Sequence, residues 1–279
     1  MNAPSINGAT RLYGIIGDPI VQVRSPETFT AGFARAGINA VMLPVQVLPD
    51  RFDVSVRGLM ALGNLDGLLV TVPYKARIVG YASRVGDTAR IIGAANALRR
   101  EADGSWTADM FDGQGFITGA RKQGHVLAGR RAALFGAGGA GSAIACGLVA
   151  GGVASLAIID IDRGRAERLA EALVRAYPGC DVRPAHGVPA DSTMIVNAST
   201  VGMKPGDGLP GEIGPLAPGT LIGDVINTEA TTPMIALARR YACPAVTGRD
   251  MHAGQGEALL AFFAAARRDP DAARSTDVR

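Results

Sequence analysis

Lys75 and Asp112 are residue types that can move a proton. Lys75 ends the segment VTVPYK, in which β-branched residues run into a proline. A proline supplies no N–H to a sheet ladder, so we expect the segment to close a strand and to leave the lysine at the strand's mouth. A catalytic lysine needs a group that polarises it or relays its proton, and Asp112, where the chain leaves its first domain, is the candidate. The alternative is two solvated surface charges.

A glycine-rich segment, GAGGAG, follows the apolar run RAALF. Gly136, Gly138 and Gly141 fit the spacing G-x-G-x-x-G, Gly139 lies in the same turn, and Asp160 ends the next apolar run. A strand, such a turn and a helix of small residues are typical of a site where a helix N-terminus binds the pyrophosphate of a dinucleotide. The alternative is a tight turn that binds nothing.

Asp160 indicates which dinucleotide the turn would bind. Its carboxylate can accept a hydrogen bond from a ribose 2′-hydroxyl and would repel a 2′-phosphate, so the sequence favours NAD over NADP. Arg163 and Arg165 lie close enough in the sequence to keep NADP open as the less favoured cofactor. Their alternative is to be solvated surface arginines.

The composition excludes several classes of partner. A net charge of +3 on 279 residues, with basic and acidic residues interleaved, leaves no basic stripe for nucleic acid or an anionic membrane. The N-terminal segment lacks the features of a signal peptide, and no apolar run reaches the roughly 18 residues of a membrane span. We therefore expect a soluble, cytoplasmic protein, a monomer or homodimer, that acts on a small molecule.

The cysteines and histidines stand apart from one another at spacings that fit neither a zinc site nor a disulfide framework. We expect no metal. The residues are Cys146, Cys180, Cys243, His125, His186 and His252.

In the first part of the chain, strand and helix patterns alternate, which predicts a mainly parallel sheet covered by helices, with a hairpin added to it. The expected strands lie at 11–18, 40–47 and 66–73, the helices at 26–37 and 51–63, and the hairpin strands at 96–101 and 105–110.

The alternation restarts near Arg130, which predicts a second α/β domain. The polar residues 269–279 are expected to fray. The expected strands of this domain lie at 131–135, 155–162, 193–200, 220–226 and 244–248, and the expected helices at 142–152, 166–177, 233–242 and 254–268.

Six segments together resemble the shikimate dehydrogenase family in their order and spacing, over nearly the whole chain. They are VTVPYK (70–75), GAANAL (93–98), DMFDGQG (109–115), GAGGAG (136–141), NASTVGM (197–203) and GRDMHAGQGEALL (248–260). The resemblance implies an α/β fold in which an N-terminal mixed-sheet substrate domain and a Rossmann-type doubly wound dinucleotide-binding domain flank a cleft. The first domain would take residues 1–112 and 249–279, and the second 113–248.

The resemblance also implies roles for individual residues. Lys75 and Asp112 would form the catalytic pair, with the lysine shuttling the proton of the oxidised hydroxyl. Asn96 and Gln255 match residues that bind ring hydroxyls, and Thr71 matches a threonine that contacts the substrate. The alternatives are that Asn96 satisfies loop backbone and that Gln255 is a polar residue near a helix start.

The segment GDPIVQVRSP departs from the family pattern, which offers two serines to the substrate carboxylate. Val23 takes the first serine position and only Ser25 remains, itself equally open to interpretation as a helix N-cap. If this segment is extended, Arg24 points away from both and is a weak candidate for a new anion contact.

Further departures cluster around the same carboxylate-binding site. Leu69, Phe111 and Asn227 stand where the family has asparagine, threonine and tyrosine, and Ala97 replaces a threonine. Each lost hydrogen-bond donor to a buried carboxylate should cost roughly 1.5–3 kcal/mol. We expect conserved chemistry at the hydroxyl end and an altered preference at the acid end.

The leading interpretation is an NAD(P)-dependent dehydrogenase that transfers hydride between the nicotinamide and a ring hydroxyl of a shikimate-like or quinate-like substrate. One alternative is a true shikimate dehydrogenase of aromatic amino-acid biosynthesis. An alternative of another class is a non-catalytic dinucleotide-binding sensor, which would not need the pair Lys75 and Asp112.

Overall fold

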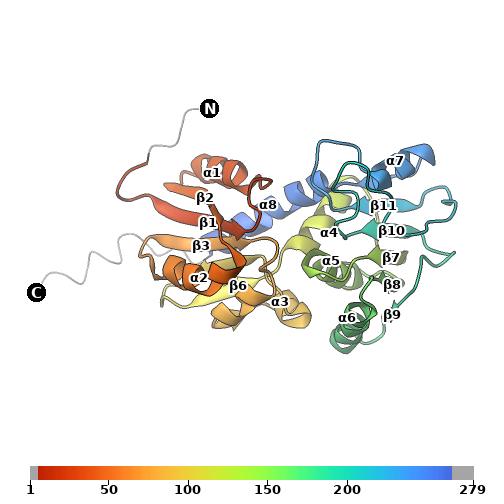
Figure 1. The fold of residues 1–279 in the computed structure, drawn as a ribbon, viewed down its shortest axis with the longest axis horizontal. Helices are drawn as coiled ribbons and strands as arrows, with labels where there is room; N and C mark the ends of the chain where they lie inside the picture. The colour runs from red at the N-terminus through yellow and green to blue at the C-terminus, as the bar shows by residue number, and fades with distance from the viewer. Residues whose placement is uncertain (1–5, 266–279) are drawn as a thin grey trace, which may run out of the picture. The chain divides into compact units, whose positions relative to one another are not determined.

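The computed structural model describes residues 6–265, which form two compact units (Figure 1). The first unit consists of residues 6–87, 94–109 and 256–265, and the second of residues 88–93 and 110–255. Each unit contains one six-stranded sheet.

The first unit is built on a mixed sheet with the strand order β2-β1-β3-β5-β6-β4. Strands β1, β2 and β3 pair in parallel, and β5 and β6 form the predicted antiparallel hairpin. The elements are β1 (Arg11–Gly17), α1 (Ser25–Arg35), β2 (Ala40–Gln46), η1 (Pro49–Arg51), α2 (Phe52–Ala61), β3 (Leu65–Val70), η2 (Arg77–Tyr81), β4 (Arg84–Val85), β5 (Ala97–Arg100) and β6 (Trp106–Asp109).

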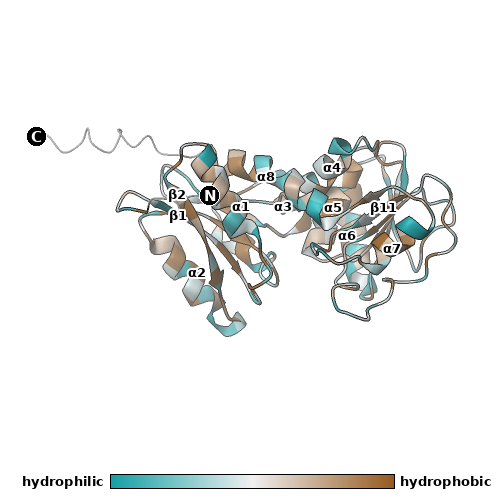
Figure 2. Cartoon of the chain, turned by 90° about the horizontal axis from the view of Figure 1, so that it is seen from above, coloured by the Kyte–Doolittle hydropathy of each residue, from teal (hydrophilic) through white to brown (hydrophobic). Residues whose placement is uncertain are grey.

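Helices cover both faces of this sheet because the two parallel crossovers run in opposite directions from β1 and β2, and both must be right-handed. Tyr13 of β1 packs against Phe33 of α1 and against the edge of Phe263 in the last helix, α8 (Gly248–Ala264), with ring centroids 4.6 and 4.9 Å apart. Figure 2 shows α2 on the opposite side of β1 and β2 from α8. The core of the unit lies in these two layers.

The second unit is built on a fully parallel sheet with the order β12-β11-β10-β7-β8-β9. The order reverses between β7 and β10, which is the switch point of a doubly wound sheet, where ligands bind beyond the carboxyl ends of the strands. The elements are α3 (Asp87–Ile92), α4 (Asp112–Lys122), β7 (Arg131–Phe135), α5 (Gly139–Ala150), β8 (Ser155–Ile159), α6 (Arg163–Ala176), β9 (Asp181–Pro184), β10 (Met194–Asn197), β11 (Leu221–Asp224), α7 (Pro233–Arg240), β12 (Ala245–Val246) and α8 (Gly248–Ala264), of which α3 and α8 also have residues in the first unit.

The predicted α/β fold class is confirmed, and each expected strand and helix is present within a few residues of its predicted bounds. The exception among the bounds is α8, which begins at Gly248, six residues before the expected start. Helices α3 and α4 and strands β4 and β9 were not expected. The predicted end of the last helix and the predicted fraying of 269–279 lie outside the described residues.

Among residues 6–265, no helix combines the length and the apolar character that a membrane span requires.

Candidate functional site

The segment VTVPYK closes strand β3, as its proline predicts. The strand ends at Val70, the Val72–Pro73 peptide bond is cis, and Tyr74 N donates to Thr71 O at 3.1 Å. The buried Tyr74 donates its hydroxyl to Val47 O, and its ring lies 4.4 Å from that of Phe52. Tyr74 therefore anchors the turn, and the next residue, Lys75, is half-buried beyond the end of β3.

Backbone hydrogen bonds join the turn to the segment that carries Asn96. Ala95 N donates to Lys75 O at 2.8 Å, and Val70 N donates to Asn96 O at 2.8 Å. Asn96 is 5% exposed, and Thr71 directly follows Val70. Three of the predicted site residues thus lie beyond the carboxyl end of β3, at one end of the first unit's sheet. They are Thr71, Lys75 and Asn96.

Ser25 is the first residue of α1 and is 8% exposed. Its interpretation as an N-cap is wrong, because Arg24 takes the cap position and makes no side-chain cap hydrogen bond. The preceding segment turns, with Val23 N donating to Ile20 O at 3.2 Å, so the assumption that it is extended is also wrong. A serine one residue inside a helix leaves its hydroxyl available for another role.

Most of the positions that depart from the family pattern carry apolar side chains that are buried in the structure. Leu69 pairs with Ala97 across β3 and β5, and both are buried. Phe111 is buried at the residue before α4, whereas Asn227 is exposed after β11. The first three positions therefore offer no side-chain hydrogen-bond donor.

Asp112 begins helix α4 in the second unit and is 4% exposed. Strand β6 ends at Asp109, and the helix starts three residues later. Gln255 of α8 donates from Nε2 to Asp112 Oδ1 at 3.0 Å. The structure thus brings together two predicted site residues that are distant in the sequence.

Glycines hold α4 and α8 close enough for this hydrogen bond. A Cβ at Gly119 would lie 2.6 Å from Asp250 O, and one at Gly115 would overlap Gln255 Cγ. A Cβ at Gly254 of α8 would likewise overlap Gly115 O. Glycine lowers helix propensity, which hid α4 in the sequence, yet here it permits the close approach of two backbones. The remaining signal was the acidic start and basic end of the segment.

The glycine-rich turn after β7 has the conformation that its spacing predicts. Gly136 has φ +94°, and a Cβ there would lie 2.9 Å from Ala198 O in the loop after β10. A Cβ at Gly141 would overlap the carbonyl oxygen of Gly136. Gly138 caps α5, which begins at Gly139, and a Cβ on Gly138 would meet no protein atom within 4 Å. The helix N-terminus therefore faces open space that suits a pyrophosphate.

Asp160 follows β8 and is held by two backbone N–H groups. Ala137 N, in the glycine-rich turn, donates to Oδ2 at 2.6 Å, and Asp162 N donates to Oδ1 at 2.8 Å. Each carboxylate oxygen keeps a lone pair for a further donor. The ribose-binding candidate is thus fixed to the turn that would hold the pyrophosphate.

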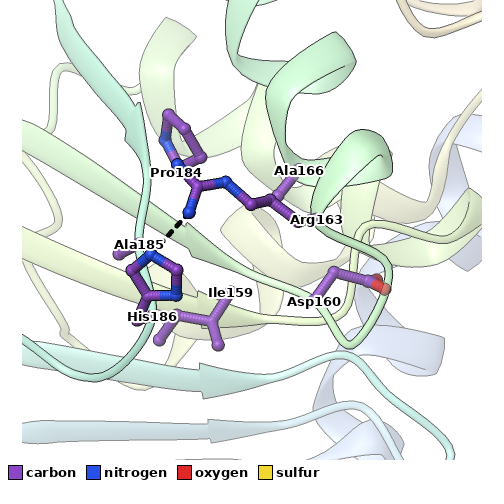
Figure 3. Close-up of a pocket in the computed structure, with 7 residues that line it drawn as sticks. All are labelled: Ile159, Asp160, Arg163, Ala166, Pro184, Ala185 and His186. Carbon is purple, nitrogen blue, oxygen red and sulfur yellow. Dashed lines mark hydrogen bonds between the residues drawn. The ribbon is translucent and has the colours of Figure 1, made fainter.

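A pocket of about 90 Å³ lies beside Asp160 (Figure 3). We call it the Asp160 pocket. Arg163 crosses it toward His186, whereas Arg165 pairs with Asp162 at 3.3 Å on the surface. The lining residues are Ile159, Asp160, Arg163, Ala166, Pro184, Ala185 and His186.

A buried polar network that the sequence analysis missed joins the loops after β10 and β11. Asn197 Nδ2 donates to Asp224 Oδ1 at 3.2 Å, and Thr232 donates its hydroxyl to Asp224 Oδ2. Asn197 Oδ1 accepts from Ser199 N and Oγ at 3.1 and 2.7 Å. Burial raises the pKa of the Asp224 carboxyl above its usual value. The sequence did contain a signal for this network, which is a polar residue at the end of each of the two buried strands.

Within residues 6–265, no cluster of three or more His, Cys, Asp or Glu side chains is arranged to hold a metal ion. Cys146 is buried, and burial raises the pKa of its thiol. His252 Nε2 is buried without a hydrogen-bond partner, and burial lowers the pKa of its imidazole.

Comparison with known proteins assigns the chain to a family. The model of the shikimate dehydrogenase substrate binding domain matches residues 15–98. A shikimate dehydrogenase (NADP(+)) of Rubrobacter xylanophilus is 37% identical over 276 residues, which cover 97% of this chain and 96% of that protein. The chain belongs to the shikimate dehydrogenase family.

Two solved structures of shikimate and quinate dehydrogenases have the same fold. A shikimate 5-dehydrogenase of Listeria monocytogenes, solved with shikimate and NAD, has a TM-score of 0.83 and 27% identity over 98% of each chain. A quinate dehydrogenase of Corynebacterium glutamicum, solved with NAD, has a TM-score of 0.82 and 27% identity over 96% of this chain and 98% of that one.

As a member of the shikimate dehydrogenase family, the protein is an NAD(P)-dependent oxidoreductase that acts on the CH–OH group of a small molecule. This assignment favours the enzyme over the alternative of a non-catalytic sensor.

Proposed function

We propose that the protein transfers hydride reversibly between NAD and a ring hydroxyl of a shikimate-like or quinate-like substrate. The observation that carries the proposal is the grouping of Thr71, Lys75 and Asn96 at one end of the sheet, joined by the bond from Ala95 N to Lys75 O. An amine beside a hydroxyl and an amide suits the binding and deprotonation of an alcohol.

In this proposal Lys75 accepts the proton of the hydroxyl that is oxidised, and Asp112 forms the catalytic pair with it. Asn96, Thr71 and Gln255 bind substrate hydroxyls, and Ser25 binds the acid end. The nicotinamide, when bound, supplies the hydride acceptor. The buried Asp112 is held by Gln255, which supports a carboxylate with one defined orientation.

The residues of the second unit fit a dinucleotide, which Gly136, Gly138, Gly139 and Gly141 would hold at the start of α5. We propose NAD as the preferred form, because the Asp160 carboxylate suits a ribose hydroxyl and repels a 2′-phosphate. NADP is the less favoured form, although the relative from R. xylanophilus is named for NADP(+).

The apolar surroundings at the acid end support a substrate preference different from that of the family. With Val23, Leu69 and Phe111 in place of polar residues, a carboxylate would find fewer donors and bind less tightly. A ring alcohol whose carboxylate sits differently, or a less polar cyclic alcohol, fits this arrangement. The second candidate is shikimate dehydrogenase itself, favoured by the name of the 37% identical relative.

Three further properties of the protein stay predictions. These are the division into a substrate-binding and catalytic domain of residues 1–112 and 249–279 and a dinucleotide-binding domain of 113–248, the cytoplasmic location, and the monomeric or homodimeric state.

The proposal is tested by following reduction of NAD and, separately, of NADP with shikimate, quinate and related ring alcohols. The variant Lys75→Ala should lose most turnover while its NAD affinity stays near that of the wild type. Lys122→Ala, an exposed lysine at the end of α4, is the matched control and should turn over normally. Equal turnover in the two variants would contradict the role of Lys75.

A further inference from the structure

The Asp160 pocket contains one permanently charged cation among its seven lining residues, and that cation is Arg163. Arg163 lies three residues beyond Asp160, at the start of α6, where a guanidinium could pair with a 2′-phosphate. Whether this arginine is available therefore bears on the choice between NAD and NADP.

Two contacts occupy the Arg163 guanidinium. Its Nε donates to Glu167 Oε1 at 2.7 Å, one helical turn along α6, and its NH1 group lies 2.6 Å from His186 Nε2. A guanidinium can only donate, so His186 Nε2 must be the acceptor and the imidazole carries its proton on Nδ1. The Glu167 carboxylate compensates the positive charge of Arg163, and the His186 imidazole fixes the direction in which the guanidinium points.

The direction matters because the two charged groups point apart. In Figure 3, Arg163 extends toward Pro184 and His186, beyond the end of β9, whereas the Asp160 carboxylate lies on the other side of the pocket. The carboxylate is itself fixed by Ala137 N and Asp162 N. The pocket thus presents an acceptor to a ribose while its cation is paired with Glu167 and His186.

We infer that His186 is a specificity-determining residue that favours NAD by holding Arg163 away from the position of a 2′-phosphate. The inference rests on the proposed NAD preference and adds a positioning residue to it. Because the Arg163 side chain is largely exposed, the contact is modest, and its removal should change relative affinities by about two- to fivefold.

The experiment compares the affinities of NAD and NADP for the intact protein by titration calorimetry, without a substrate. The two ligands differ only in the 2′-phosphate, so the ratio of their dissociation constants isolates that group. His186→Leu removes the acceptor and should shift the ratio toward NADP by about two- to fivefold. His186→Gln keeps an acceptor oxygen and should stay close to the wild-type ratio.

Two further variants test the route and the specificity of the effect. Adding Arg163→Met to His186→Leu should cancel the shift, because the freed guanidinium is what binds the phosphate. His125→Leu, in the loop after α4 and outside the pocket, should leave the ratio unchanged.

The outcomes separate the inference from the proposal on which it rests. A wild type that prefers NAD, with an unchanged ratio in His186→Leu, overturns the role of His186 and leaves the NAD preference standing. A shift that persists without Arg163, or that is equally large in His186→Gln, also overturns it. A wild type that prefers NADP overturns both.

Discussion

Gln255 donates a hydrogen bond to the buried carboxylate of Asp112, with Nε2 and Oδ1 3.0 Å apart. The two residues are 143 positions apart in the chain and meet where α8 crosses α4 over a set of glycines. The hydrogen bond gives a proposed substrate-binding residue a second task, which is to orient a proposed catalytic one.

Gln255→Leu should lower the free energy of unfolding by about 1–3 kcal/mol, because a buried charged acceptor loses a donor. It should also reduce turnover, since a hydrogen bond that helps to orient Asp112 is removed. Urea denaturation and steady-state kinetics measure the two effects. Gln123→Leu, exposed after α4, is the control. Wild-type stability in Gln255→Leu would show that the bond contributes little.

Gly138→Ala and Gly141→Ala should separate cofactor binding from folding. A Cβ at Gly138 meets no protein atom and the residue has φ −77°, so this variant should fold normally but lose dinucleotide affinity through overlap with the pyrophosphate. A Cβ at Gly141 overlaps the Gly136 carbonyl, so that variant should be destabilised. Thermal unfolding and NAD titration check both, and normal NAD affinity in Gly138→Ala would place the cofactor elsewhere.

Asp160→Ala should shift the ratio of kcat/KM for NAD and NADP toward NADP, because the repulsion of a 2′-phosphate is removed. Asp181→Ala is the matched control, since its side chain is exposed at the start of β9 and does not line the Asp160 pocket. Initial rates with each cofactor provide the measurement. If Asp160→Ala keeps the wild-type ratio, another residue recognises the ribose.

Asp224→Asn should change how stability depends on pH. Burial raises the folded-state pKa of Asp224, so the folded protein binds this proton more tightly than the unfolded chain does. The wild type should therefore lose stability relative to the variant as the pH rises from about 4, the unfolded pKa, through the raised folded pKa. The difference should then stay constant at higher pH.

An asparagine suits this test because it can preserve the network. Its amide oxygen can accept from Asn197 and Ile226 N, and its NH₂ group can donate to the Thr232 hydroxyl. Urea unfolding of both proteins between pH 4 and pH 8 gives the comparison. A wild type that gains stability relative to the variant over this range would contradict the raised pKa.

Local patterns in the sequence are enough to specify many of the strands and turns of this fold. The apolar runs around Val70 and Phe135 form strands because their side-chain periodicity acts on neighbouring residues. The proline of VTVPYK ends β3 wherever that strand lies, and Gly141 is required by a contact within the turn itself, because a Cβ there would overlap the Gly136 carbonyl. Such signals need no knowledge of distant parts of the chain.

The contacts between residues that are distant in the sequence depend on how the whole chain folds. The glycine-rich segment of α4 gave no helix prediction, yet it forms a helix because α8 approaches it closely enough to offset the low propensity of glycine. The pairing of Gln255 with Asp112, of Asn197 with Asp224 and of His186 with Arg163 depends on the order of strands and the packing of helices. No local pattern contains these contacts, because a hydrogen bond across the fold is set by the coordinates of both partners.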